Sequence, residues 1–215
     1  MTIDRDNSIE RSHQLSQQQV ADAVSPHALA GLLFQAGATY VMIGGHVLGY
    51  LTGNPRATVD VDVIVSTSHI AKAVKAVHAK FPELVSEDLV YNVRFNSKQG
   101  GGRVSAERID LVRDNVPLFN RILNKYAVSV QAMGQVLQLP TAEAAVALKF
   151  AAAISPNRGN ENRPQDRADL LAIVTKHRAL KHDVLNELGD LVYPGGGQEL
   201  KDFCNAVWRG ETPTL

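Results

Sequence analysis

The spacing of apolar residues along the chain changes from helical periodicity to strict alternation and back. Residues 26–37 place leucines at helical spacing after a Ser-Pro start, which predicts a helix. Residues 39–45 form a short, β-branched and apolar run that ends in Gly44 and Gly45, and residues 46–55 predict a compact helix closed by a glycine and a proline. The pattern therefore predicts a strand, a tight turn and a helix.

A strictly alternating strand follows, with the sequence VDVDVIV over residues 59–65. Its four valines share one face, and Asp60 and Asp62 share the other. Residues 68–81 then predict an amphipathic helix. Two further strands are expected at residues 88–95 and 107–113, joined by a hairpin loop with glycines at 100–102.

Helical patterns dominate after residue 139. They predict helices at residues 141–154, 164–177, 182–192 and 198–208, with residues 193–198 as a glycine-rich linker. Residues 1–24 are a polar N-terminal segment, and residues 1–16 show neither period, so no regular structure is expected there. The fold class is interpreted as α+β, with a mixed β-sheet and flanking helices in residues 25–139 and a C-terminal α-helical domain in residues 140–215.

Composition and charge narrow the class of protein. The 215 residues are 45% apolar, which is enough for a core of ordinary size with a small helical addition. Lys and Arg number 22, as do Asp and Glu, so a nucleic acid would need a local patch. The single cysteine, Cys204, excludes a disulfide framework and a thiolate zinc cluster, and no apolar run is long enough to span a membrane. We expect a soluble, cytoplasmic protein with no membrane partner.

Asp60 and Asp62 form the first candidate site. Because they are two residues apart on a strand, their Cα atoms are about 7 Å apart and both carboxylates leave the same face. At an effective dielectric constant of about 20, two such charges repel by roughly 2.5 kcal/mol, so a cation is expected beside them. The alternative is that both acids decorate the solvated face of an edge strand.

Gly44, Gly45 and His46 lie where the preceding strand ends and a helix begins. The amino terminus of a helix attracts phosphate through its unpaired N–H groups, and glycines let phosphate oxygens approach the backbone. The alternative is a tight turn without a ligand. Because the helix terminus disfavours the imidazolium form of His46, we expect a neutral ring that hydrogen-bonds a nucleotide or the backbone.

Asp110 is the third acid, with Ile109 and Leu111 on the opposite face of its strand. If this strand is the neighbour of residues 59–65, three carboxylates converge. Such an all-oxygen set suits Mg²⁺, which completes its coordination with water and substrate phosphates. Taken alone, Asp110 is better explained as a surface acid.

These motifs resemble those of a known family. Gly44-Gly45, the segment RATVDVDV at residues 56–63 and the segment IDL at residues 109–111 resemble the nucleotidyltransferase superfamily of polymerase β type. In the helical half, the segments LKFAA at residues 148–152 and RPQDRADL at residues 163–170 resemble the abortive-infection type toxin nucleotidyltransferases of type IV toxin–antitoxin systems. The resemblance extends from about Tyr40 to Leu171.

The resemblance implies a nucleotidyltransferase-type sheet and the Mg²⁺-dependent transfer of a nucleoside monophosphate from a nucleoside triphosphate, such as ATP, to an acceptor hydroxyl. It implies that Asp60, Asp62 and Asp110 bind two Mg²⁺ ions and that Asp110 helps to deprotonate the acceptor. Gly44 and Gly45 are expected to hold the β and γ phosphates. The implied acceptor is a tRNA or a protein, and the implied partner of such a toxin is an antitoxin protein.

Four further residues have both a functional and a structural interpretation. Lys149 lies on an alanine-rich helix with room for a phosphate or an acid beside it, which favours a catalytic role, and the alternative is a snorkelling lysine on the surface of the helix. Asp166 belongs to the nucleotide site or caps the start of its helix, and Asp169 pairs with Lys149 or Arg158 and positions them. Arg56 contacts a phosphate or is solvated.

Basic residues in the second half of the sheet region form a candidate RNA-facing patch. They are Arg103, Arg108, Arg113, Arg121 and Lys125. A run of charge more often marks a solvated face, so the solvated interpretation is preferred.

Two other functions are weighed against nucleotidyl transfer. The first is an inactive nucleotide-binding module that acts through a partner protein, and the presence of all three acids argues against it. The second is a D-x-D glycosyltransferase, which usually needs more parallel strands before its acids than this chain offers.

Overall fold

The structure is a computed structural model that describes residues 7–19, 23–98, 104–132, 134–156, 158–159 and 162–215. The chain forms two compact units, Met1–Leu139 and Pro140–Leu215. Among the described residues, no helix has both the length and the apolar character that crossing a membrane requires.

The first unit is built around a five-stranded mixed sheet with the strand order β1-β2-β5-β4-β3. Its strands are β1 (Tyr40–Met42), β2 (Val61–Val65), β3 (Val85–Asp88), β4 (Asn92–Lys98) and β5 (Val104–Arg113). β2 and β5 are parallel, and the other neighbouring pairs are antiparallel. Since a parallel pair needs a crossover connection, the chain passes through a helix and two strands before β5 returns beside β2. The two acid-bearing strands are therefore neighbours inside the sheet.

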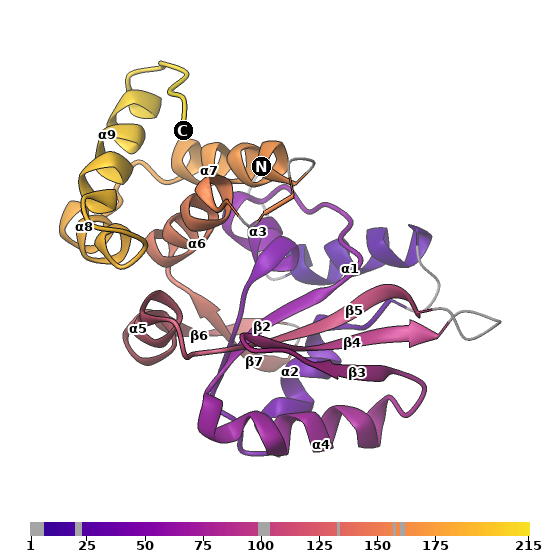
Figure 1. The fold of residues 1–215 in the computed structure, drawn as a ribbon. Coiled ribbons are helices and arrows are strands. Elements are labelled where there is room, and N and C mark those ends of the chain that lie inside the picture. The colour runs from indigo at the N-terminus through magenta and orange to yellow at the C-terminus, as the bar shows by residue number, and fades with distance from the viewer. Residues whose placement is uncertain (1–6, 20–22, 99–103, 133, 157, 160–161) are drawn as a thin grey trace. The chain divides into compact units, whose positions relative to one another are not determined.

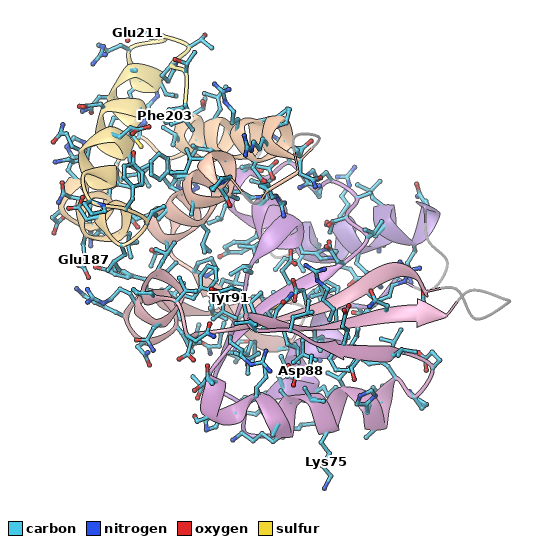
Figure 2. The ribbon with its side chains drawn as sticks, viewed as in Figure 1. Lys75, Asp88, Tyr91, Glu187, Phe203 and Glu211 are labelled. Atoms are coloured by element: carbon cyan, nitrogen blue, oxygen red, sulfur yellow. The ribbon has the colours of Figure 1, made fainter. Side chains whose placement is uncertain are left out.

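One face of the sheet is apolar and covered. The valines of β2 are buried on this face, together with Ile109 and Leu111 of β5. Helix α4 (Ile70–Lys80) lies along this side in Figure 1, and its His78 ring packs edge-on against Phe95, with 5.1 Å between ring centroids. The side chain of Lys75 on the same helix points away from the sheet, as Figure 2 shows.

The opposite face of the sheet carries the aspartates. Helices α1 (Ser8–Gln19) and α3 (Gly44–Thr52) lie on this side of the sheet in Figure 1. Helix α2 (Pro26–Gln35) contacts both α1 and α4, and it begins as predicted, with Ser25 accepting a hydrogen bond from the Ala28 N–H at 3.3 Å. The acids therefore face helices rather than open solvent alone.

Helix α1 shows that the expectation of no regular structure is wrong for residues 8–16, whereas residues 1–6 lie outside the described residues. Its buried side is mainly polar, because Ser8, Ser12 and Ser16 are only 4%, 0% and 1% exposed, respectively. Ile9 is the one large apolar residue of this helix that is fully buried among the described residues. Serine hydroxyls hydrogen-bond main-chain atoms on this side, so the helix docks without the apolar stripe from which it would have been predicted.

Other elements of the first unit also differ from the predicted pattern. β2 begins at Val61 rather than Val59, and Val59 is 42% exposed, so only three of the four valines share the buried face. The physical reason is that the N–H of Thr58 donates to Ser16 on α1 instead of to a neighbouring strand, so contacts with α1 hold the segment before Val61. The pattern does not predict β3, α5 (Pro117–Lys125), β6 (Ala127–Ala132) or β7 (Gln135–Pro140).

The second unit consists of the four predicted helices. They are α6 (Ala142–Ile154), α7 (Arg163–Lys176), α8 (His182–Asp190) and α9 (Gly196–Trp208). The expected linker is in part a packing contact, because α9 already begins at Gly196. A Cβ at Gly197 would overlap the backbone of Asn186 on α8, so glycine is needed for this close approach.

The basic residues weighed as a candidate RNA-facing patch do not share one face of the sheet where the structure describes them. Arg108 is 4% exposed, so neither the RNA-facing nor the solvated interpretation holds for it. Arg113 lies on the other face of β5, where its guanidinium donates to the carbonyl of Leu89 and to the carboxylate of Asp88, which Figure 2 labels. Arg103 and the glycines at 100–102 lie outside the described residues.

Candidate active site

Asp62 and Asp110 lie side by side in the sheet. They are in register on the parallel strands β2 and β5, so both side chains leave the same face. Neighbouring strands are about 4.8 Å apart, and two unit charges at that distance repel by about 3 kcal/mol at an effective dielectric constant of about 20. The prediction that these strands are neighbours is confirmed, and the pair favours a cation at this face.

Asp60 lies in the segment directly before β2, two positions from Asp62. The hydroxyl of Thr58 donates to Asp60 Oδ1 at 2.8 Å, which orients the carboxylate. The structure does not close the three acids into a cluster: within the part of the chain that it describes, no three His, Cys, Asp or Glu side chains are gathered closely enough to hold an ion. Asp62 and Asp110 are thus direct neighbours in the sheet, and Asp60 lies in the segment before β2.

Gly44 begins helix α3 with a φ of +78°, in the left-handed region that favours glycine. A Cβ at this position would overlap the carboxylate of Asp62, so the close approach also requires glycine. The N–H of Ile43 donates to the carbonyl of Asp62 at 2.9 Å, which keeps the turn beside β2. The positive end of the α3 dipole therefore lies at the Asp62 carboxylate.

Gly45 makes the second close approach at this turn. A Cβ at Gly45 would lie 3.0 Å from Cβ of Thr58, which is tighter than ordinary van der Waals contact. The two glycines thus let the amino terminus of α3 pack directly against Asp62 and Thr58. The backbone N–H groups of this terminus lie next to the acids, and such groups attract phosphate oxygens.

The chemistry of these groups fits Mg²⁺. This ion binds through one or two carboxylates and completes its octahedral shell with water and substrate phosphates rather than with a cage of protein ligands. The in-register pair of Asp62 and Asp110 supplies such carboxylates. The amino terminus of α3 beside them supplies backbone N–H groups for phosphate oxygens.

Strand β4 adds two polar side chains to the same face that the sequence analysis does not single out. Arg94 is in register with Asp110, and Asn92 Nδ2 donates to Asp110 Oδ1 at 2.6 Å. Both alternate with the buried residues Val93 and Phe95. This alternation is the signal that predicts them, because polar residues at every second position of a central strand share the face of the site.

His46 has a buried, neutral ring. It is 2% exposed, and its pKa is lowered to about 3, mainly by burial and further by the charges of His13 and Arg56. The expectation of a neutral ring is confirmed, but burial rather than the helix terminus is the main cause. Burial also lowers the pKa of His13 on α1 and of His27 on α2, so the three rings belong to one packed region of the first unit.

Arg56 lies in the same segment as Thr58, ahead of β2. Its carbonyl accepts a hydrogen bond from the Ser12 hydroxyl at 2.5 Å, and its Nη1 donates to the Ala57 carbonyl at 3.3 Å. The side chain is partly exposed. Its contact with a phosphate stays a prediction.

The second unit holds a buried ion cluster around Lys149. Its Nζ lies 2.9 Å from Asp166 Oδ1 and 2.7 Å from Asp169 Oδ2, and both aspartate side chains are only 2% exposed. Arg158 Nε donates to Asp166 Oδ2 at 2.8 Å, and Gln165 Nε2 donates to Asp169 Oδ1 at 2.7 Å. The side chain of Lys149 is 15% exposed, so the ammonium group is held in one place between two buried carboxylates.

These contacts show which of the interpretations made from the sequence holds for Lys149, Asp166 and Asp169. The prediction that Asp169 pairs with Lys149 is confirmed. Both oxygens of Asp166 bind cationic side chains of the cluster, so the interpretation as a helix cap is wrong. Lys149 is not a surface lysine, because its side chain is only 15% exposed. The acids that approach it belong to this chain, and the small residues of α6 leave room for them.

Solved structures with a similar fold include nucleotidyltransferases. The crystal structure of an antigenic nucleotidyltransferase-like protein from Paracoccidioides brasiliensis matches with a TM-score of 0.51 and 17% identity, over 87% of this chain and 91% of that chain. JHP933 from Helicobacter pylori matches with a TM-score of 0.48 and 12% identity, over 94% and 93% of the two chains. The antibiotic-resistance factor ANT(2'')-Ia matches with a TM-score of 0.48 and 11% identity, over 86% and 91%. The likeness to the Paracoccidioides brasiliensis structure shows a nucleotidyltransferase-like fold, as predicted.

A family model narrows this class. The model of the nucleotidyl transferase AbiEii toxin of type IV toxin–antitoxin systems matches residues 27–200. Because the match covers most of the chain, this protein belongs to the AbiEii family and is a nucleotidyltransferase, which confirms the resemblance seen in its motifs. A comparison with curated protein sequences finds no match.

Proposed function

We propose that this chain transfers a nucleoside monophosphate from a nucleoside triphosphate to a hydroxyl group of RNA or protein, as the toxin of a toxin–antitoxin pair. The observation that carries the proposal is the in-register pair of Asp62 and Asp110 beside the amino terminus of α3. A triphosphate with a divalent cation matches both features, because carboxylates attract the cation and helix N–H groups attract phosphate oxygens.

Each acid has a proposed role. Asp60, Asp62 and Asp110 hold Mg²⁺, with two ions expected from the family resemblance. When bound, Mg²⁺ neutralises phosphate charge and stabilises the entering and leaving oxygens. Asp110 also takes the proton of the acceptor hydroxyl, and the hydrogen bond from Asn92 keeps its carboxylate in place for this step.

The turn beside these acids binds the triphosphate. The backbone at Gly44 and Gly45 receives the β and γ phosphates, and His46 contributes its main chain because its ring is buried. Arg56, in the segment before β2, neutralises part of the phosphate charge. The base of the nucleotide has no assigned contact in this proposal.

Lys149 is the proposed catalytic cation of the second unit. Asp166 and Asp169 are proposed to act through it, since both carboxylates are engaged by its ammonium group and hold it in place. Asp169 thus keeps its expected positioning role, and Asp166 takes the same role in place of a direct nucleotide contact. Arg158 is 47% exposed and supports Asp166 in the same cluster.

Thermal unfolding with ligands tests the site. We expect Mg²⁺ together with one of ATP, GTP, CTP or UTP to raise the melting temperature, and either component alone to raise it much less. The shift should disappear in Asp62→Asn and in Asp110→Asn. The matched control is Asp88→Asn, since Asp88 is 73% exposed and on the other face of the sheet. A full shift in Asp62→Asn would contradict the proposal.

A labelling experiment identifies the acceptor. The protein is incubated with triphosphates labelled at the α phosphate, together with total RNA or with cell protein. We expect label in one of the two pools, removed by nuclease if the acceptor is RNA and by protease if it is protein. Nucleotide binding without any transfer would instead support the inactive nucleotide-binding module.

A further inference from the structure

A chain of hydrogen bonds connects helix α1 to Asp60. The Ser12 hydroxyl donates to the Arg56 carbonyl at 2.5 Å, and the Thr58 N–H donates to the Ser16 hydroxyl at 3.0 Å. The Thr58 hydroxyl in turn donates to Asp60 Oδ1 at 2.8 Å. Two main-chain atoms of the segment before β2 are thus bound by buried serines that lie more than forty positions away in the sequence.

We propose that Thr58 is a positioning residue that orients Asp60, and that Ser12 and Ser16 of helix α1 hold Thr58 in the position to do so. The proposal rests on the proposed function, in which Asp60 is a cation ligand. It assigns a catalytic purpose to an N-terminal helix that carries none of the catalytic groups.

The local backbone explains why Asp60 needs this support. β2 begins only at Val61, so no strand pairing of β2 orders Asp60, whereas Asp62 is held in register with Asp110. A carboxylate on a non-strand segment can rotate, and a hydrogen bond to one oxygen restricts it while the other oxygen stays free of Thr58. The hydrogen bond from Thr58 therefore orients Asp60, just as strand pairing orients Asp62.

Close packing against the start of α3 also holds Thr58 in place. Its Cβ would be 3.0 Å from a Cβ at Gly45, so the turn at the start of α3 lies directly against it. A Cβ at Gly49 would be 3.4 Å from the Ser8 carbonyl, which shows how closely α1 approaches α3. The small side chains of Ser8, Ser12 and Ser16 permit this approach, and their burial leaves the hydroxyls in place to bind the segment.

The test compares Thr58→Val, which keeps the shape and removes the hydroxyl, with Thr58→Ser, which keeps the hydroxyl. Mn²⁺ serves as the probe, and its binding to the nucleotide-free protein is measured by electron paramagnetic resonance. We expect the dissociation constant to rise about tenfold in Thr58→Val, the low end of the range for a hydrogen bond to a charged group. Thr58→Ser should restore it to near the wild-type value. Wild-type affinity in Thr58→Val would overturn the proposal.

Thr67→Val is the matched control, because the Thr67 hydroxyl donates to Asp114 Oδ1 at 2.7 Å, outside the site. It removes the same kind of hydrogen bond, so its Mn²⁺ affinity should be unchanged. Equal weakening in Thr67→Val and Thr58→Val would mean a general structural effect and would overturn the positioning role. The concentration of Mg²⁺ that gives half-maximal transfer should follow the Mn²⁺ results.

Two further variants separate this proposal from the function on which it rests. Asp60→Asn should lose Mn²⁺ affinity at least as strongly as Thr58→Val. If Asp60→Asn binds Mn²⁺ normally, the cation site itself is wrong, whereas a defect in Asp60→Asn with wild-type affinity in Thr58→Val overturns only the role of Thr58.

The contribution of α1 is tested with Ser16→Ala. It should weaken Mn²⁺ binding in the same direction as Thr58→Val, and the double variant should be little worse than Thr58→Val alone, because both changes interrupt one chain of contacts. Fully additive effects in the double variant would overturn the link between α1 and Asp60.

Discussion

Replacing Lys149 with methionine leaves two buried carboxylates without the cation that lies between them. The side chains of Asp166 and Asp169 are 2% exposed, so both carboxylates are removed from bulk water and depend on the lysine for charge compensation. Removing one partner of a buried ion pair destabilises a protein by about 3–5 kcal/mol. We place Lys149→Met in this range, because Asp166 and Asp169 both lose their ion pair with Lys149, while Arg158 still contacts Asp166 and Gln165 still donates to Asp169.

The single tryptophan offers a probe of the same unit. Trp208 lies on α9, donates to the Val174 carbonyl at 3.0 Å and stacks on the His182 ring at 5.8 Å between centroids. Its fluorescence during urea unfolding therefore reports on the second unit rather than on the sheet. With an m-value of about 1–1.5 kcal/mol per molar urea, the midpoint should fall by about 2–5 M in Lys149→Met.

Two further variants make this prediction specific. Lys176→Met removes an exposed lysine of α7 and should change the stability by no more than about 0.5 kcal/mol. Lys149→Met combined with Asp166→Asn and Asp169→Asn removes the stranded charges and should recover a large part of the lost stability. A midpoint in Lys149→Met that matches Lys176→Met would refute the reasoning, because the lysine would then not be compensating the buried acids.

Three other predictions concern the turn, the buried histidines and the helix contact. Gly44→Ala should lower nucleotidyl transfer at least a hundredfold by displacing Asp62. The control Gly53→Ala has nearly the same backbone strain, at a φ of 76°, and should lose stability only. Equal losses of activity in the two variants would argue against the turn as part of the site. The unfolded chain protonates His46 near its ordinary pKa of 6.5 and the folded chain only near 3, so stability is complete above pH 6.5 and is lost as the pH falls towards 3. Between pH 7 and pH 5 this amounts to about 2 kcal/mol, and His46→Leu should flatten the pH dependence of the melting temperature; an unchanged slope would contradict it. Gly197→Ala should destabilise the second unit by about 1–3 kcal/mol in the Trp208 assay, and an unchanged urea midpoint would show that α8 and α9 do not need this contact.

The part of the site on regular strands could be predicted from the sequence. Alternation placed Asp62 on the polar face of β2, and the same rule applied to Asp110 on β5, so their convergence needed only the correct strand neighbours. The glycine turn at the start of a helix could also be predicted from the sequence, because few residues other than glycine tolerate the backbone conformation of Gly44.

The remainder depends on contacts that alternation and helical periodicity do not describe. Helix α1 buries serines whose hydroxyls bind main-chain atoms, so its sequence looks solvated although Ser12 is fully buried. Asp60 lies outside β2 because Ser16 and Thr58 hold its segment, and no local propensity contains that long-range contact. The two glycines that begin α9, Gly196 and Gly197, resemble part of a flexible linker, yet they pack against α8.

The central claim is that Asp62 and its neighbours catalyse transfer of the α phosphate. The most direct measurement incubates the wild-type protein, Asp62→Asn and Asp88→Asn with Mg²⁺, acceptor and a nucleoside triphosphate labelled at either the α or the γ phosphate. The account predicts that wild type and Asp88→Asn attach only the α label to the acceptor and release the γ label in pyrophosphate, and that Asp62→Asn does neither. Transfer of the γ label, or α-label transfer by Asp62→Asn at the wild-type rate, would contradict it.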